Sequence, residues 1–264
     1  MPRALRGAAF TPTTVAGQRR QSPLSSRRYS ARVTKPVPTL AVVPAHNEAA
    51  SVGEVVHRIT AVGYPVLVLD DGSTDATASE AAAAGATVVT MPVNLGVGGA
   101  MRAGFRYAVD HGYERVVQVD ADLQHPPEDI SKLIAAADDG TDLVVGSRFA
   151  EGYRAEGYRR VAMRGVAAIV SRMLGMKLDD VTSGFRVVSE PLLSKFADQY
   201  PAEYLGDTVE SLLQAHASGA TIAQVSVSMD PRAAGEPTSR VAAGGHLARL
   251  AVAVVAGKPQ RMGR

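Results

Sequence analysis

The sequence contains no cysteine. Disulfide bonds and thiolate chemistry are therefore excluded, and any metal site must use oxygen or histidine ligands. The sequence also lacks an uninterrupted apolar stretch of the ~20 residues that a helix needs to cross a bilayer, which predicts that the chain does not span a membrane by itself. A third absence is local, because no acidic residue precedes Glu48.

Residues 1–36 form a basic arm with seven Arg and one Lys. Without these eight cations, 20 Lys and Arg remain against 26 Asp and Glu, a net charge of −6, so the positive charge of the sequence belongs largely to the arm. The arm is rich in Ser, Thr and Pro and lacks apolar periodicity, which predicts disorder. Its composition is typical of a transit peptide, but a solvated tail or an over-long predicted start explains it equally well.

The remaining chain is long enough for a single domain, which we expect over residues 37–241, followed by a C-terminal segment at 242–264. From residue 37, short apolar runs alternate with stretches of helical periodicity. This alternation predicts right-handed crossovers, and hence an α/β fold with a Rossmann-like, mostly parallel sheet flanked by helices. The strand and helix pairs are expected within residues 39–64, 65–86, 87–113 and 114–140, with a fifth strand within 141–149.

Polar or glycine-rich turns follow all five predicted strands. In sheets of this kind, ligands bind at the carboxyl ends of the strands. One polar turn could be accidental, whereas five at the same edge predict a binding site. The turns are "PAHNE" at 44–48, "DDGSTD" at 70–75, "NLGVGGA" at 94–100, "DADLQ" at 120–124 and "GSR" at 146–148.

Asp120, Asp122 and Gln124 occupy alternate positions at the end of the fourth predicted strand. If the chain stays extended, alternate side chains share one face and their oxygens converge. Mg²⁺ and Mn²⁺ prefer such oxygen ligands and usually leave positions for substrate phosphates. The alternative is a polar turn after a strand, because Asp is a common loop residue.

Six motifs in this order resemble glycosyltransferase family 2. They are "VVPAHNEAASV", "VLVLDDGSTDAT", "NLGVGGAMRAGF", "VVQVDADLQHPPEDI", "LVVGSRF" and "DVTSGFRVV". Within the family, the sequence is most similar to polyprenyl-phosphate sugar transferases of the dolichyl-phosphate mannose synthase type, over about residues 38–230. The resemblance implies a GT-A fold, a nucleotide-diphosphate sugar donor and a divalent cation, Mg²⁺ or Mn²⁺.

The resemblance also implies which residues contact the donor. Asp70, Asp71 and Glu48 could accept hydrogen bonds from the base and ribose, although Ser73 or Asp75 could instead cap a helix. The glycines of "NLGVGGA" allow the backbone to approach a ligand, and their place after the third strand argues against a dinucleotide fingerprint. The expected donor-binding residues are Pro44, Ala45, Asn47, Glu48, Asp70, Asp71, Ser73, Gly98, Asp120 and Ala121.

Asp120, Asp122 and Gln124 match the metal-binding segment of the family. The cation would bridge the donor diphosphate and neutralise charge on the leaving nucleotide, with Asp122 also counted among the catalytic residues. An acceptor phosphate is already ionised near neutral pH, so it can attack the anomeric carbon with inversion and without a strong base. A hydroxyl acceptor would need a base, for which Asp207 and Glu210 are candidates; a role of Glu210 at a helix N-terminus stays open.

Arg148, Arg160 and Arg164 stand where relatives present arginines to the acceptor phosphate. Positions 160 and 164 are one helical turn apart and could bind one anion together. Met163 and Ala167 replace the Ser and Asn that are usual in the family. We interpret Arg172 as a surface charge.

Four further positions have weaker signals. Arg232 is expected to close over the donor diphosphate, and Arg240 is the less secure match because its spacing from Gly235 is longer than in the family. Arg186 ends "DVTSGFR", where a structural role is an equal alternative. We interpret His125, which precedes a proline, as a loop residue and not as a metal ligand.

The C-terminal segment is apolar from Leu247 to Ala256 and is followed by basic residues. This pattern is typical of an interfacial helix, with a helix packed on the core of the domain as the alternative. We therefore expect a cytoplasmic enzyme, peripheral on the membrane face, with a GDP- or UDP-linked donor, a polyprenyl phosphate acceptor and no nucleic-acid partner. The alternatives are transfer to a soluble or polymeric hydroxyl, and a non-catalytic nucleotide-sugar-binding subunit.

Overall fold

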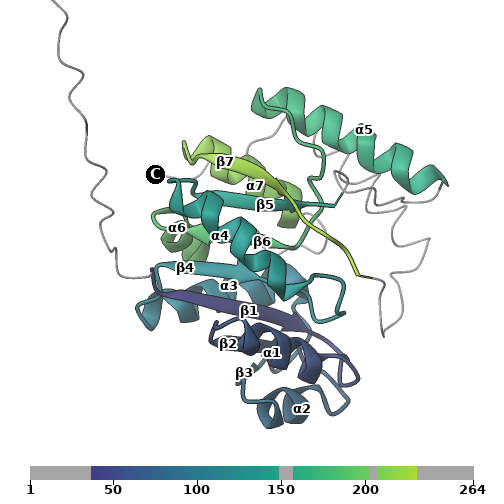
Figure 1. Ribbon diagram of the computed structural model, residues 1–264, viewed down its shortest axis with the longest axis vertical. Coiled ribbons are helices and arrows are strands. Elements are labelled where there is room, and N and C mark those ends of the chain that lie inside the picture. Colours follow the sequence, from purple (N-terminus) through teal and green to yellow (C-terminus); the bar gives the residue numbers. More distant parts are fainter. Residues whose placement is uncertain (1–36, 149–156, 202–206, 231–264) are drawn as a thin grey trace, which may run out of the picture. The chain divides into compact units, whose positions relative to one another are not determined.

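A computed structural model describes residues 37–148, 157–201 and 207–230 of the chain, without the side chains of 157–162 and 207 (Figure 1). Its centre is a seven-stranded sheet in the order β3-β2-β1-β4-β6-β5-β7. The strands are β1 (Thr39–Ala45), β2 (Val66–Asp70), β3 (Thr87–Thr90), β4 (Arg115–Gln118), β5 (Leu143–Ser147), β6 (Arg186–Ser189) and β7 (Ile222–Ser226).

Helices cover both faces of the sheet, so the chain has the GT-A type of α/β architecture expected from the sequence. One apolar cluster joins the sheet to α1, α2 and α4, and a second joins its other face to α3, α5, α6 and α7. The helices are α1 (Val52–Ala61), α2 (Thr77–Ala83), α3 (Gly96–Asp110), α4 (Ile130–Asp138), α5 (Gly157–Leu174), α6 (Leu192–Gln199) and α7 (Asp207–Ala217), and the short 3-10 helix η1 (Pro127–Asp129) precedes α4.

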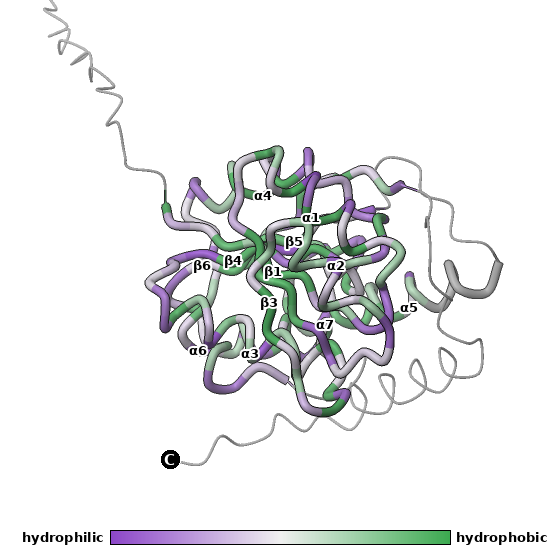
Figure 2. Tube along the Cα trace, turned by 90° about the horizontal axis from the view of Figure 1, so that it is seen from below, coloured by the Kyte–Doolittle hydropathy of each residue, from purple (hydrophilic) through white to green (hydrophobic). Residues whose placement is uncertain are grey.

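The central strands are buried on both faces. Every residue of β1 and β2 is buried, which explains why their sequences are continuous apolar runs and do not alternate. Figure 2 shows this pattern as hydrophobic colour along β1, β4 and β5 in the middle of the fold. β1 pairs in parallel with both β2 and β4, so the carboxyl ends of these strands meet at one edge.

Strand β6 departs from the parallel pairing of the other strands. It lies between β4 and β5 and is antiparallel to both. Neither β6 nor β7 is among the five strands predicted from the sequence. Because β6 runs in the opposite direction, its first residue, Arg186, pairs with Gln118, the last residue of β4.

Gly104 brings α3 close to the sheet. A Cβ atom at this position would lie 2.7 Å from Val42 Cγ1 and 2.8 Å from Leu69 Cδ1. The absence of a side chain therefore lets the helix pack directly on β1 and β2. This packing holds the first turn of α3 beside the carboxyl ends of the same two strands.

Candidate donor and metal site

The turns after β1 and β2 are joined to each other by hydrogen bonds. The Asp71 amide donates to the Ala45 carbonyl at 2.8 Å, and the His46 ring contacts the Asp71 carbonyl at 2.8 Å. Asn47, which has a positive φ of 56°, donates from its amide to Ser73 Oγ at 3.0 Å and accepts from the Thr74 amide at 2.8 Å. The two turns therefore form a single rim at this edge of the sheet.

Asp71 connects this rim to the glycine-rich turn. Its carboxylate accepts hydrogen bonds from the amides of Leu95, at 2.7 Å, and Gly96, at 2.8 Å, where α3 begins. Asp70 accepts from the Ser73 amide at 3.1 Å. Both acids thus organise loops as well as standing where a nucleoside is expected, and their contact with the donor stays a prediction.

The other expected donor residues lie in or next to the same turns. The Glu48 amide donates to Thr77 Oγ1 at 2.8 Å, and its carboxylate accepts from Ser51 Oγ at 3.0 Å. Asp75 accepts from the Thr77 amide at 2.9 Å, but the N-cap of α2 is Ala76, without a side-chain cap, so neither Ser73 nor Asp75 occupies the capping position considered above. Pro44 and Ala45 are buried in β1, and Gly98 is buried in the first turn of α3. Ala121 is buried within residues 120–124, here called the metal turn because it carries the predicted metal ligands.

The segment with Asp120, Asp122 and Gln124 is a turn and not an extended strand. β4 ends at Gln118, Leu123 has a positive φ of 62°, and the Gln124 amide donates back to Asp122 Oδ1 at 3.0 Å. The expectation that strand alternation places these side chains on one face was therefore wrong. The Asp122 carboxylate closes the turn instead, which keeps the two acids at the end of β4.

A divalent cation fits these residues only together with a ligand. Within the described ranges, no group of three or more His, Asp or Glu side chains could hold a metal by itself. Two carboxylates and the Gln124 amide oxygen would leave coordination positions for diphosphate oxygens and water, which suits Mg²⁺ or Mn²⁺. Gly184 adds a steric observation, because a Cβ there would lie 2.7 and 2.8 Å from the two Asp120 carboxylate oxygens.

His125, which the sequence indicated to be a loop residue, is buried and contacts Asp120 and Phe185. Only 3% of it is exposed, and its Nδ1 accepts a hydrogen bond from the Asp120 amide at 3.2 Å. Its ring stacks on Phe185, with the ring centroids 5.0 Å apart. The sequence signal was missed because the stacking partner is distant in the chain and the neighbouring prolines indicated only a loop.

Arg148 is held by an ion pair within the domain. Its Nε and Nη2 lie 2.6 and 3.0 Å from the two oxygens of Asp180, and Nη2 also donates to Thr182 Oγ1 at 2.8 Å. Burial acts to raise the pKa of the Asp180 carboxyl, but the hydrogen bonds and charge of Arg148, together with hydrogen bonds from Thr182, outweigh it and lower this pKa. The predicted contact of Arg148 with an acceptor phosphate stays a prediction.

The remaining candidate cations differ in how much is described. Arg164 is exposed on α5; Arg160 lies one turn earlier on the same helix, and its side chain is outside the described residues. Arg186 is fully buried, with hydrogen bonds to Ser211 Oγ at 2.7 Å and the Ser183 carbonyl at 2.5 Å, which supports its structural role. Arg232, Arg240 and segment 242–264 lie outside the described residues.

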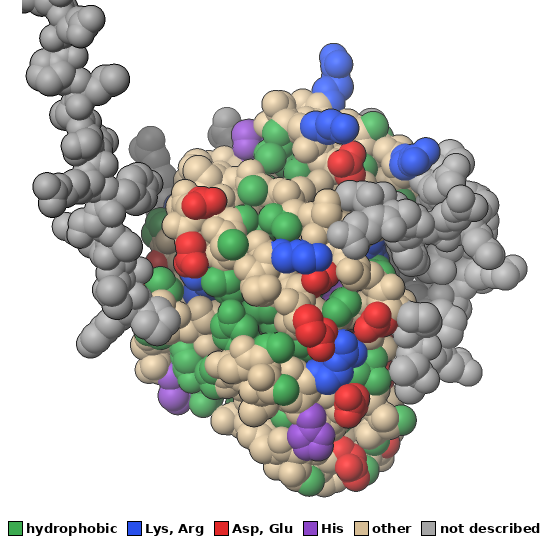
Figure 3. Space-filling view, viewed as in Figure 1, with side chains coloured by type: hydrophobic (Ala, Val, Ile, Leu, Met, Phe, Trp, Pro, Cys, Tyr) green, Lys and Arg blue, Asp and Glu red, His purple; other side chains and the backbone are tan. Residues whose placement is uncertain are grey.

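The last described residue, Asp230, lies against the metal turn. Its amide donates to the Gln124 carbonyl at 3.0 Å, and its carboxylate is 3.4 Å from Arg58. Arg58 is also 2.9 Å from Glu128. Figure 3 shows that acidic and basic side chains lie beside one another on one face of the molecule. The described chain therefore ends beside Gln124, and Arg232 is two residues further on in the sequence.

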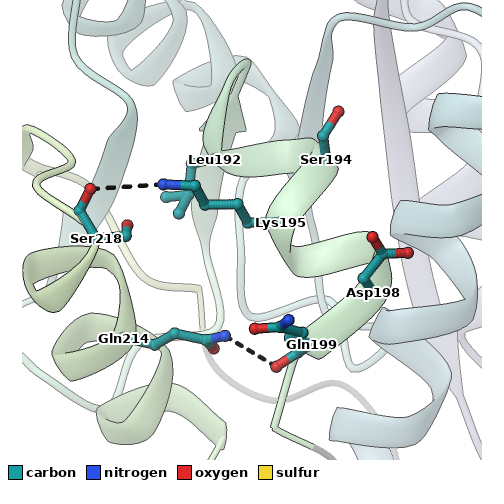
Figure 4. Close-up of a pocket in the computed structure, with 7 residues that line it drawn as sticks. All are labelled: Leu192, Ser194, Lys195, Asp198, Gln199, Gln214 and Ser218. Atoms are coloured by element: carbon teal, nitrogen blue, oxygen red, sulfur yellow. Dashed lines mark hydrogen bonds between the residues drawn. The ribbon is translucent and has the colours of Figure 1, made fainter. Parts of the chain in front are cut away.

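A hollow on the described surface lies elsewhere, between α6 and α7 (Figure 4). It has a volume of about 430 Å³. Across it, Lys195 Nζ lies 3.5 Å from the Ser218 carbonyl, and Gln214 donates to the Gln199 carbonyl at 3.0 Å. None of the predicted site residues lines this hollow, so the donor site is defined by its chemistry and not by this cavity.

Acids and glycine-rich turns gather at the carboxyl edge of the sheet, which is where ligands bind in open α/β sheets. Residues 40–200 match the family described as Glycosyl transferase family 2. The chain therefore belongs to glycosyl transferase family 2 and is a glycosyltransferase.

Curated relatives share this region of the chain. Over 168 residues the chain is 36% identical to the polyprenol monophosphomannose synthase of Mycolicibacterium smegmatis, covering 60% of this chain and 63% of that protein. It is 30% identical over 208 residues to the undecaprenyl-phosphate mannosyltransferase of Micrococcus luteus, covering 75% of this chain and 85% of that protein. The chain thus spans slightly less than two thirds of the first relative and most of the second.

Solved structures confirm the fold. The glucosyl-3-phosphoglycerate synthase of Mycobacterium tuberculosis in complex with uridine diphosphate has a TM-score of 0.68 at 24% identity, covering 86% of this chain and 82% of that chain. The same synthase in complex with Mn²⁺, uridine diphosphate and glucosyl-3-phosphoglycerate has a TM-score of 0.66 at 23% identity, covering 87% and 84%.

Proposed function

We propose that this enzyme transfers a sugar from a nucleotide-diphosphate sugar, GDP- or UDP-linked, to polyprenyl phosphate, with inversion and with Mg²⁺ or Mn²⁺. The observation that carries the proposal is the placement of Asp120 and Asp122 at the end of β4, which pairs with β1 beside the Asp70 and Asp71 turn. The names of the curated relatives support the acceptor class.

The donor would lie across the carboxyl ends of β1, β2 and β4. The rim of Asp70, Asp71 and Glu48 would accept hydrogen bonds from the nucleoside, and the first turn of α3 would allow close approach to its backbone. Asp120, Asp122 and Gln124 would hold the cation, which supplies charge neutralisation at the diphosphate when it is bound. Arg232, two residues beyond Asp230, would close over the same diphosphate.

The acceptor phosphate would be held from α5. Arg160 and Arg164 are four residues apart, so they share one side of the helix and could bind one phosphate together. Because that phosphate is ionised near neutral pH, the protein needs to position it and does not need to deprotonate it. Asp207 and Glu210 would become candidate bases only with a hydroxyl acceptor.

Substitution of the acids tests the metal and donor part of the proposal. Asp120→Asn and Asp122→Asn should abolish transfer and Mn²⁺-dependent nucleotide binding, because each removes a charged ligand, while the melting temperature in EDTA should barely change. Transfer is measured from GDP- and UDP-sugars to polyprenyl phosphate as a lipid-extractable product that mild acid cleaves. Full activity of either variant contradicts the assignment.

Substitution on α5 tests the acceptor class. Arg164→Gln should weaken the use of polyprenyl phosphate by about 10- to 150-fold with donor affinity unchanged, because it removes a charge-assisted hydrogen bond. Arg172→Gln, also exposed on α5, is the matched control and should behave like the wild type. Equal turnover of a simple glycoside hydroxyl would favour the alternative, a soluble or polymeric acceptor.

We also propose that the enzyme acts at the cytoplasmic face of the membrane, because its acceptor would be lipid-linked. Among the described helices, none is long and apolar enough to cross a bilayer. The attachment would come from segment 242–264, whose apolar run and basic flanks suit an anionic lipid surface. Assignment of the enzyme to a transferase family argues against the remaining alternative, a non-catalytic subunit.

A further inference from the structure

The Asp120 carboxylate is surrounded by residues that do not belong to the metal turn. Gln118 Nε2 donates to Asp120 Oδ1 at 3.4 Å, and His125 Nδ1 lies 3.6 Å from Oδ2. On another side lies Gly184, where a Cβ atom would clash with both carboxylate oxygens of Asp120. The Asp120 side chain is 37% exposed, whereas Gln118 is only 2% exposed, so the contacts come from the buried side of the site.

The reversed direction of β6 produces this environment. Residues that precede an antiparallel strand lie at the edge where its parallel neighbours end, so Gly184 reaches Asp120 although 64 residues separate them in the sequence. The pairing of Gln118 with Arg186 places both side chains on the same face of the sheet. Gln118 and Arg186, at the paired end of β4 and start of β6, are here called the floor of the Asp120 site.

This floor carries buried polar atoms without partners. Gln118 Oε1 and Arg186 Nε are both buried and make no hydrogen bond among the described residues. Arg186 is fully buried, and no carboxylate of the described chain forms an ion pair with it. The hydrogen bonds of Arg186 support a structural role for its guanidinium, but they leave these two buried atoms, which belong to residues paired across β4 and β6, without partners at a cost in stability.

The amide of Gln118 contacts the site instead, because its Nε2 donates to Asp120 Oδ1 while its Oε1 has no partner among the described residues. An acidic ligand that is already held in place loses less freedom when it coordinates a cation, and partners of metal ligands commonly affect metal affinity for this reason.

We propose that Gln118 and Gly184 are positioning residues that hold the Asp120 carboxylate in the orientation needed for a divalent cation and the donor diphosphate. This inference rests on the proposed metal role of Asp120. Gln118 acts by donating to Oδ1, and Gly184 acts by leaving room for both oxygens. Neither residue coordinates the cation itself.

The test uses Gln118→Met and Gly184→Ala in the full chain. Mn²⁺ affinity is measured by calorimetry and by electron paramagnetic resonance, with UDP and with GDP, and thermal melting is measured in EDTA. Gln118→Met keeps the side-chain length but loses the amide, and should weaken Mn²⁺ binding by about 10-fold. Gly184→Ala displaces the carboxylate and should weaken it by about 10- to 100-fold. Both should raise the KM for Mn²⁺ more than they lower kcat.

Two matched controls separate positioning from general damage. Gln214→Met also removes an amide with one hydrogen bond and one buried oxygen without a partner, but on α7. Gly104→Ala also adds a crowded Cβ, 2.7 Å from Val42 on β1, and Asp120 is not among its nearest neighbours. Both controls should keep wild-type Mn²⁺ affinity, even where the melting temperature falls.

Wild-type Mn²⁺ affinity in Gln118→Met and Gly184→Ala would overturn the inference, as would a loss equal to that of the two controls. Asp120→Asn distinguishes this failure from failure of the proposed function. If Asp120→Asn abolishes Mn²⁺ binding while the other two variants keep it, only the positioning role is wrong. If Asp120→Asn also keeps Mn²⁺ binding, both proposals fail. They also fail if the wild type does not bind Mn²⁺ in the presence of either UDP or GDP.

Discussion

Replacing Arg148 with Met should destabilise the protein strongly, although the sequence predicts that this arginine contacts an acceptor phosphate. The change keeps the apolar stem and removes two contacts to Asp180, at 2.6 and 3.0 Å. Asp180 is only 1% exposed, so its carboxylate would remain buried without its principal cation.

The size of the effect follows from breaking a buried ion pair on one side. Removing one partner of such a pair costs about 3–5 kcal/mol, because the other charge stays desolvated. For a domain of this size that corresponds to a melting temperature lower by about 6–20 °C. Arg148→Met combined with Asp180→Asn should recover most of the loss, since no unpaired charge is then buried.

The pH dependence provides an independent check. In the wild type the pKa of Asp180 is lowered, so its contribution to stability is present above the unfolded pKa and is lost as the pH falls through the folded pKa. In Arg148→Met, burial is the main remaining influence and should raise this pKa. The destabilisation should then be largest near neutral pH and smaller in acid.

Urea unfolding followed by circular dichroism measures these differences between pH 4 and pH 8, at about pH 7 for the principal comparison. The reasoning is refuted if Arg148→Met unfolds at the wild-type urea concentration and the double variant gains nothing. If the same variant also loses polyprenyl phosphate use with donor binding intact, Arg148 serves the acceptor and not the fold.

Two further predictions concern the packing of α3 and the C-terminal segment. Gly104→Ala should lower the free energy of unfolding by about 1–3 kcal/mol through its clash with Val42 and Leu69, whereas Gly165→Ala, with open space on α5, should be neutral or stabilising in the same urea titration. Deletion of residues 246–264 should reduce co-sedimentation with anionic vesicles, and unchanged binding would contradict an interfacial role.

The sequence predicted the parallel part of the fold well because its signals are local. β1 and β2 are buried throughout and, apart from Thr39 and Asp70 at their ends, apolar, and the polar turns that follow them appear at the expected edge. β7 was not anticipated, because it is only partly buried and has no distinctive pattern. The expected role of Gly96 in a glycine-rich turn is consistent with its positive φ of 78°.

The candidate site was less predictable where its contacts depend on distant residues. The acids at 120 and 122 were identified by type and spacing, but the turn that holds them depends on Leu123 adopting a positive φ. The preference of Arg148 for Asp180 was not visible either, because both a phosphate and a carboxylate satisfy a guanidinium in the same way.

The direction of β6 explains why the environment of Asp120 was not predicted. A short run such as "RVVS" indicates a buried strand through its apolar residues, but nothing in it specifies whether the strand runs parallel or antiparallel to its neighbours. A parallel β6 would have placed Gly184 at the opposite edge, away from Asp120. Since the strand is antiparallel, the residues before it reach the acids after β4. Gly184, which shows no functional signal in the sequence, therefore lies against Asp120.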